Sequence, residues 1–155
     1  MDIDAASSGA SPEARQQRLA ILARAPEDLL EQAWQNWPQP PHVTPLRAPE
    51  TGLIMTTARA GGAGQAFHMG EVTVSRAVVR LAGGTLGYGY VLGQRPRHAE
   101  LVACFDALAA EGSRASEIRE HVLAPAARRI EADERDARGR AEATRVDFST
   151  LVREG

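Results

Sequence analysis

A glycine pair inside a long β-type segment is the feature that most limits how this chain can fold. Residues 71–93 read EVTVSRAVVRLAGGTLGYGYVLG, in which β-branched and aromatic residues lie on both sides of Gly83-Gly84. Two glycines between such runs are typical of a two-residue β-hairpin loop, because that loop requires positive φ angles. The segment therefore predicts an antiparallel hairpin.

The position of this loop also predicts which side chains share a face. On one face it pairs Leu81 with Leu86, Val79 with Tyr88 and Ala77 with Tyr90, which is apolar enough for a core. The other face pairs Arg80 with Gly87, Val78 with Gly89 and Arg76 with Val91. Two guanidinium groups beside bare backbone predict a surface that contacts phosphate or the carboxylates of a partner chain. The alternative is a solvated face with exposed charges.

Helical segments lie on both sides of the β region. Residues 1–10 are small and polar and predict a disordered lead-in, and 11–155 predict a single domain. Within it we expect helices over 11–37, strands over 43–93, a helical arm over 98–145 that Pro125 interrupts, and a docking tail over 146–155 that carries Phe148 and Leu151. The expected fold is α+β, an antiparallel sheet of about four strands packed by the N- and C-terminal helices.

Composition excludes several classes of function. The chain has 155 residues and a net charge of −2, which argues against a general nucleic-acid binder. Its 18 basic residues are all arginine, so a Walker-type loop and a lysine Schiff base are excluded. One cysteine allows neither an internal disulfide nor an iron–sulfur cluster. With no apolar leader and no spanning run, the expected location is cytoplasmic, without contact with membrane.

Motifs that suggest chemistry have plainer explanations here. Gly61-Gly62-Ala63-Gly64 lies between two strands, so it predicts a hairpin loop rather than a phosphate cradle. His98-Ala99-Glu100 looks like the start of a zinc-deaminase motif, but the two cysteines that must follow are missing, and we expect an ordinary polar histidine near a helix start. Cys104 lies in an apolar helical stripe and predicts a core residue. We therefore assign no catalytic residue, metal ligand or cofactor.

An ordered set of motifs nevertheless resembles a known family, the G subunits of the bacterial carbon–phosphorus lyase system (PhnG). The resemblance covers roughly 47–109 and 145–153. It is carried by Pro49-Glu50-Thr51-Gly52-Leu53, Arg59-x-Gly61-Gly62-x-Gly64, Gly70-Glu71, Arg76, Val79-Arg80-Leu81, Gly84-x-x-Gly87-Tyr88, His98-Ala99-Glu100 and Arg145-Val146-Asp147-Phe148. Gln94-Arg95 and Ser149 depart from the family pattern.

The resemblance implies a role in phosphonate breakdown. In that family the G subunit acts with the H, I and L subunits (PhnH, PhnI and PhnL) to displace adenine from ATP by a phosphonate, which gives a ribose 1-phosphonate 5-triphosphate. The J subunit (PhnJ) later cleaves the carbon–phosphorus bond, and the I subunit is regarded as the nucleosidase-like catalyst. The resemblance thus implies a structural subunit of a transferase complex that is not catalytic by itself.

Two other functions remain open from the residues. One is a self-sufficient enzyme that binds phosphate or phosphonate through Arg76 and Arg80, and the other is a ligand sensor that uses the same face. The favoured interpretation is the subunit, with contacts to partner chains or phosphate expected at Arg76, Arg80, Gly87, Gly89, Phe148 and Leu151.

Overall fold

The computed structural model describes residues 11–145 and has an α+β fold, as expected from the sequence. Two helices come first, followed by three strands and then a helical C-terminal part. The elements are α1 (Pro12–Arg24), α2 (Glu27–Gln35), β1 (Val43–Arg59), the short turn η1 (Ala60–Gly62), β2 (Ala66–Leu81), β3 (Leu86–Leu92), α3 (Pro96–Ala110), α4 (Ala115–Ile118), the π-helical turn η2 (Arg119–Leu123) and α5 (Ala124–Ala143).

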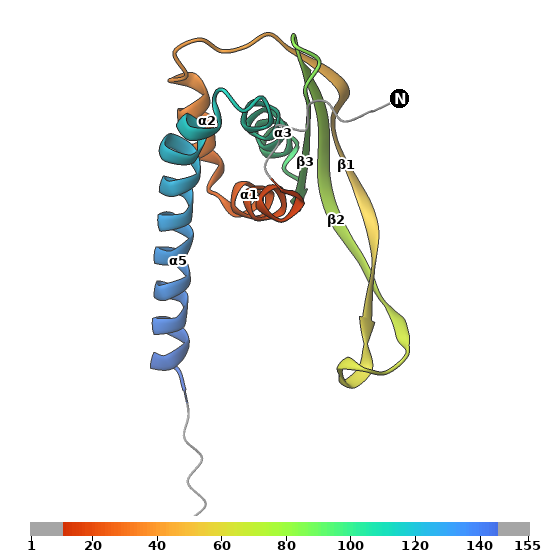
Figure 1. Cartoon of the computed structure of the whole chain (residues 1–155). Helices are drawn as coiled ribbons and strands as arrows, with labels where there is room; N and C mark the ends of the chain where they lie inside the picture. The colour runs from red at the N-terminus through yellow and green to blue at the C-terminus, as the bar shows by residue number, and fades with distance from the viewer. Residues whose placement is uncertain (1–10, 146–155) are drawn as a thin grey trace, which may run out of the picture.

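The strands form one antiparallel sheet in the order β1-β2-β3, so the described residues hold three strands rather than about four. The difference arises because β1 is one long strand that begins at Val43 and contains Pro45 and Pro49. Proline is tolerated there because β1 is an edge strand and its outer amides have no strand to bond. Figure 1 shows the helices on one side of the sheet, with the β1–β2 hairpin extending past α1 and α3.

Helix α3 is the central element of the core. Eleven of its residues are buried, and it packs against β2 and β3 on one side and α1 and α2 on the other. Phe105 lies at the centre of this layer, with its ring centroid 5.7 Å from that of Trp34 and 6.2 Å from that of Trp37. Both tryptophans are therefore packing residues.

The register of the β2–β3 hairpin differs from the expected one by a single residue. The loop has three residues, Ala82, Gly83 and Gly84, of which Gly84 has a φ of 90°. The Leu81 amide donates to the Thr85 carbonyl oxygen at 2.9 Å and closes the loop. Three-residue loops whose last residue is left-handed are a common alternative to two-residue loops. One extra loop residue moves every β3 side chain to the opposite face.

The glycines of β3 therefore face the core, contrary to the expectation that they lie beside the arginines. Gly87 pairs with Val79 and Gly89 pairs with Ala77, both of which are buried. A Cβ added at Gly87 would lie 1.9 Å from the Ala103 carbonyl oxygen of α3. These glycines let the backbone of the chain's own helix approach the sheet, so the exposed contact track predicted at Gly87 and Gly89 is wrong.

Pro125 interrupts the regular α-helical pattern of the C-terminal segment without ending the helix. Proline has no amide to donate to the carbonyl four residues earlier, and its ring crowds that carbonyl. The chain responds with the wider turn η2, where the Ala124 amide donates to the Arg119 carbonyl oxygen, and the helix then continues as α5. Figure 1 shows α5 extending past the other helices, as the predicted arm requires.

We predict that Gly89→Ala destabilises the fold by about 3 kcal/mol, the upper end of what overpacking a core costs. The new Cβ would lie 1.8 Å from the Ala99 carbonyl oxygen, and backbone cannot move aside as a flexible side chain can. Chemical denaturation measures the change in the free energy of unfolding. Gly52→Ala is the matched control on an edge strand, because its Cβ meets nothing within 4 Å. Equal stability of the two variants would contradict the observed register.

Candidate interaction surface

Asp106 in α3 carries a buried carboxylate that the sequence analysis did not identify. Its side chain is completely buried and receives the guanidinium groups of two α1 residues, at 2.5 Å from Arg15 Nη2 and 2.9 Å from Arg18 Nη2. The Tyr88 amide of β3 also donates to it, at 3.1 Å. Asp106 therefore joins α1, α3 and the free edge of β3. The hydrogen bond from Arg15 to this carboxylate raises the pKa of Arg15.

The Asp106 carboxylate has a structural role, because both of its oxygens already accept hydrogen bonds and no solvent reaches it. One signal for it was present in the sequence. An acidic residue lies inside the otherwise apolar stretch that reads LVACFDALAA, and such a residue must find cationic partners when the helix is buried. The partners are far away in the sequence, so their identity could not be inferred.

We predict that Asp106→Asn destabilises the protein by about 3–5 kcal/mol, the range for removing one partner of a buried ion pair. Chemical denaturation is the measurement. Glu50→Gln is a matched control, since Glu50 also lies between two arginines but is exposed, with Arg47 Nη1 at 2.6 Å and Arg76 Nε at 2.7 Å. We expect little measurable change for this control because exposed pairs contribute little. Similar losses in both variants would contradict a structural role specific to Asp106.

The His98-Ala99-Glu100 motif holds helices together. His98 is completely buried rather than an ordinary surface histidine, and its Nε2 donates to the Leu22 carbonyl oxygen of α1 at 2.9 Å. Ala99 contacts Gly89, and Glu100 accepts a hydrogen bond from Arg97 at 2.7 Å. The motif therefore attaches α3 to α1 and the sheet.

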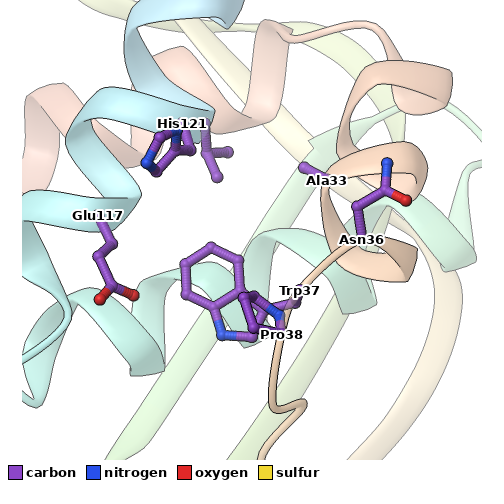
Figure 2. Close-up of a pocket in the computed structure, with 7 residues that line it drawn as sticks. Ala33, Asn36, Trp37, Pro38, Glu117 and His121 are labelled. Atoms are coloured by element: carbon purple, nitrogen blue, oxygen red, sulfur yellow. The ribbon is translucent and has the colours of Figure 1, made fainter.

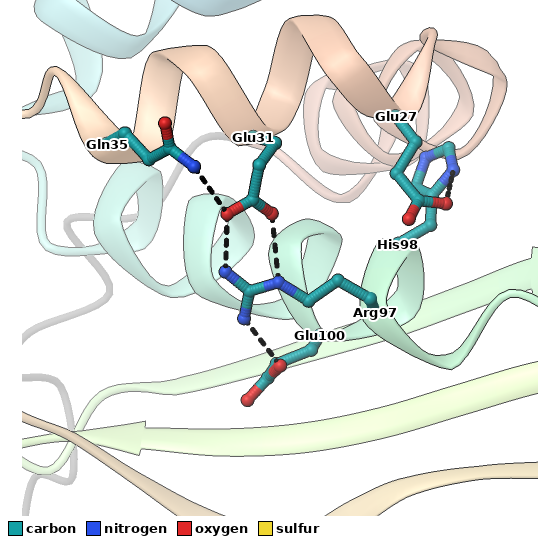
Figure 3. Close-up of polar contacts among 6 residues, drawn as sticks. All are labelled: Glu27, Glu31, Gln35, Arg97, His98 and Glu100. Atoms are coloured by element: carbon teal, nitrogen blue, oxygen red, sulfur yellow. Dashed lines mark hydrogen bonds and ion pairs between the residues drawn. The ribbon is translucent and has the colours of Figure 1, made fainter.

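Arg97 continues this contact to α2, as Figure 3 shows. Its guanidinium group binds the Glu31 carboxylate with two hydrogen bonds of 2.9 and 3.0 Å. Gln35 donates to the same carboxylate at 3.2 Å. The hydrogen bond from Arg97 lowers the pKa of Glu31, so this carboxylate stays ionised over the neutral range.

We predict a pH dependence of stability from His98. Burial is the largest cause and lowers the pKa of His98 from the ordinary value of 6.5, and Arg95 lowers it further. The hydrogen bond to the Leu22 carbonyl oxygen and the Glu27 carboxylate, 3.9 Å from Nδ1, oppose this shift without reversing it. The unfolded chain then binds the proton more readily than the folded chain. The free energy of unfolding is therefore highest above pH 6.5 and falls as the pH is lowered, by at most about 1.4 kcal/mol per pH unit.

Denaturation midpoints measured between pH 7.5 and about 5 check this expectation. His98→Gln should remove the histidine part of the slope, whereas His121→Gln, on the exposed surface of η2, should leave it intact. A slope that persists unchanged in His98→Gln would contradict the assignment.

Two residues with nucleophilic side chains are engaged in packing. Cys104 is buried in the core as expected, and burial raises the pKa of its thiol to about 12. Ser75 uses its hydroxyl in three hydrogen bonds, as donor to the Gly93 carbonyl oxygen at 2.8 Å, as acceptor from the Arg95 amide at 2.7 Å, and with the Thr51 hydroxyl at 3.0 Å. Within residues 11–145, no group of three histidine, cysteine or acidic side chains is placed to hold a metal ion.

The glycine-rich segment is a hairpin loop between β1 and β2, as expected. Gly61 and Gly62 have φ angles of 62° and 80°, and the Gly64 amide donates to the Ala60 carbonyl oxygen at 2.9 Å. Arg59 donates from Nη1 to the Gly64 carbonyl oxygen at 3.2 Å. These groups therefore close the loop on itself.

An open pocket of about 520 Å³ lies between the end of α2 and the α4–η2 segment. Figure 2 shows the Trp37 ring, Glu117 and His121 around it. The remaining lining residues are Ala33, Asn36, Pro38 and Val122. Neither Glu117 nor His121 is buried, so both are solvated polar groups at the rim. The pocket has no polar side chain fixed inside it to orient a ligand.

The sheet also carries an exposed apolar surface. All of the exposed large apolar side chains recorded for residues 11–145 belong to the three strands. They are Leu46, Leu53, Ile54, Met55, Phe67, Met69, Leu86, Tyr88, Tyr90 and Leu92. On β3 they alternate with the buried residues of the core face, and Tyr90 and Leu92 are 54% and 70% exposed. We call the side of the sheet opposite the helices the outer face.

Arg76 and Arg80 lie on this outer face, but their neighbours are large residues rather than glycines. Arg76 pairs with Tyr90 and Arg80 pairs with Leu86. Arg76 is held by Glu50, and this hydrogen bond raises the pKa of Arg76. Arg80 has no ion pair within the described part of the chain. Phe148 and Leu151, the other predicted contact residues, lie outside the described residues.

Extended exposed apolar areas are typical of surfaces that bind proteins, membranes or ligands. The described residues include no helix long and apolar enough to cross a membrane. The structure thus defines a class of protein. It is an α+β protein whose helices cover one face of the sheet and leave the other exposed, and whose buried ionisable groups hold the helices together.

Comparison with known sequences gives the family. Residues 13–154 match the family described as "Phosphonate metabolism protein PhnG". The chain is 42% identical over 156 aligned positions to the alpha-D-ribose 1-methylphosphonate 5-triphosphate synthase subunit PhnG of Rhizobium meliloti (strain 1021), covering 99% of this chain and 97% of that protein. The chain belongs to the PhnG family, which confirms the resemblance found in the sequence.

Proposed function

We propose that this chain is a subunit of an alpha-D-ribose 1-methylphosphonate 5-triphosphate synthase in phosphonate catabolism. In this proposal it acts in the cytoplasm with the PhnH, PhnI and PhnL subunits, which together displace adenine from ATP by a phosphonate, and it also contacts PhnJ. Support comes from the synthase-subunit relative, which matches nearly the whole chain. The observation on the molecule that carries the proposal is the bare outer face of the sheet, with Tyr90 and Leu92 exposed.

The role of the chain in this complex is assembly. Displacing a nucleobase requires a positioned nucleophile, a proton for the leaving base and cations for the triphosphate. In the described residues the buried carboxylate of Asp106 and the imidazole of His98 hold helices together, and the thiol of Cys104 is protonated at neutral pH. Arg80 is the cation best placed to meet an acidic group of a partner from the outer face.

The test is co-expression with the PhnI subunit, followed by measurement of the mass of the purified complex. We expect a stable complex, and no release of adenine when the isolated chain is incubated with ATP and methylphosphonate. Adenine release by the isolated chain would favour the self-sufficient enzyme instead. A well-folded chain that remains alone in the presence of its candidate partners would overturn the proposal.

We predict that Leu92→Asp weakens this complex at least about tenfold while leaving the isolated chain folded. Leu92 is 70% exposed, so a charge there costs little in the free chain, but it would have to be desolvated against a partner. Affinity measured by calorimetry or surface binding, together with a thermal melt, checks both parts. The control is Gln16→Asp on the exposed side of α1. Unchanged affinity of Leu92→Asp would contradict the outer face as the interface, as would equal losses in Leu92→Asp and the control.

A further inference from the structure

The two halves of the free edge of β1 differ in the features that block pairing with another strand. β1 pairs with β2 on one side only, and no strand of the described residues lies along its other side. An exposed edge strand is a template for pairing with other chains, and proteins block such edges with proline, charge and bulges. Figure 1 shows the distal half of β1 extending, together with β2, past α1 and α3.

The first half of the edge carries all three of these blocking devices. Pro45 and Pro49 remove backbone donors, and Arg47 and Glu50 form an ion pair at 2.6 Å. Two register shifts, between Pro45 and Arg47 and between Arg47 and Glu50, bend the strand. A second chain cannot form a regular ladder along this half.

The second half, residues 52–58, lacks proline and charge. Its one register shift, between Thr56 and Thr57, arises from an extra residue in β2 rather than in β1. The second half reads GLIMTTA, and its Leu53 and Met55 side chains are 63% and 57% exposed. An uncharged apolar segment of this length on a free edge is an aggregation hazard if it stays uncovered. The contrast with the first half indicates that strand pairing with another chain is prevented along the first half of β1 and permitted along the second half.

The antiparallel pairing of β1 with β2 determines which backbone groups of β1 point to its free edge. The Gly93 amide donates to the Thr73 carbonyl oxygen at 2.8 Å, so the backbone of Thr73 is turned toward β3 and away from β1. Thr73 lies opposite Leu53 in β1. Because hydrogen-bonded and non-bonded pairs alternate in an antiparallel ladder, the amides and carbonyls of Leu53 and Met55 point to the free edge. Those of Ile54 bond to β2.

We propose that residues 52–58 of β1 receive a β-strand from another subunit of the synthase, which continues the sheet beyond β1. This inference rests on the proposed function. The main-chain groups of Leu53 and Met55 bond the incoming strand, and its apolar side chains at alternate positions pack beside those of the same two residues. The partner segment is therefore extended and apolar at every second position.

The occupant is a different polypeptide rather than a second copy of this chain. A second copy that pairs along β1 would lengthen the sheet away from β3 and would leave Tyr88, Tyr90 and Leu92 exposed at the opposite edge. A larger partner that lies across the outer face can cover those residues and also reach the edge of β1. The absence of charge in 52–58 agrees with a desolvated contact and gives no attraction for an anionic lipid surface.

Hydrogen exchange at single-residue resolution tests the proposal on the wild-type complex with PhnI. In the isolated chain the Leu53 and Met55 amides should exchange freely, whereas Ile54 is protected by its bond to β2. In the complex the Leu53 and Met55 amides should become protected by at least about tenfold. A complex that forms and leaves both amides as exposed as before would overturn the strand addition.

A pair of variants tests the same point independently. Met55→Pro removes an amide that points to the free edge and leaves the β1–β2 bonds in place, so we expect loss of affinity by more than about tenfold with little change in the melting temperature. Met55→Thr keeps the amide and should retain most of the affinity. Equal affinity of Met55→Pro and wild type would overturn the inference, as would an isolated chain that forms a dimer which Met55→Pro dissociates. A wild-type chain that joins no partner would overturn the proposed function together with it.

Discussion

The close approach of α3 to the sheet determines most of the structure. Gly87 and Gly89 offer bare backbone to a helix face of small residues, Ala99, Ala103 and Ala107, so the helix carbonyls lie where a side chain of β3 would otherwise be. This contact brings Asp106 within reach of the Tyr88 amide and turns its carboxylate toward α1. It also buries His98 against Leu22. The polar contacts that join the helices therefore depend on the absence of two side chains.

A sheet of three strands has two faces, and the helices occupy only one. The residues that alternate with the glycines on β3 are large and apolar, and they point away from the core. In an isolated protein such exposed apolar residues would favour aggregation. Because a relative of this chain is named as a synthase subunit, contact with a partner subunit would explain them. The same explanation covers the unprotected half of β1. Tyr90 and Leu92 lie on the outer face, whereas Leu53 and Met55 lie on the other face of the sheet, opposite Thr73 and Glu71. The proposed partner therefore contacts two separate parts of the sheet.

Much of this architecture could be predicted from local patterns, and the errors came from interactions that such patterns do not contain. The cap at Ser11, the hairpin at Gly61-Gly62 and the core position of Cys104 follow from short-range rules. The faces of β3 were wrong because a glycine pair fits a two-residue or a three-residue loop equally well, and only packing against α3 decides between them. Asp106 and His98 were missed because their partners on α1 lie far away in the sequence. Whether Arg76, Arg80, Phe148 and Leu151 touch another chain stays a prediction.

The π-helical turn before Pro125 has a consequence for the direction in which the C-terminal arm presents its side chains. A turn of this kind holds one residue more than an ordinary helical turn, and each residue of an α-helix advances the azimuth by about 100°. Deleting a single residue there would rotate all of α5 by that angle about its own axis. Glu134, which meets Arg24 of α1, would then face another quadrant. The extra residue therefore sets the rotation of α5 about its axis, and through it one proline determines which side chains of this 20-residue helix face solvent.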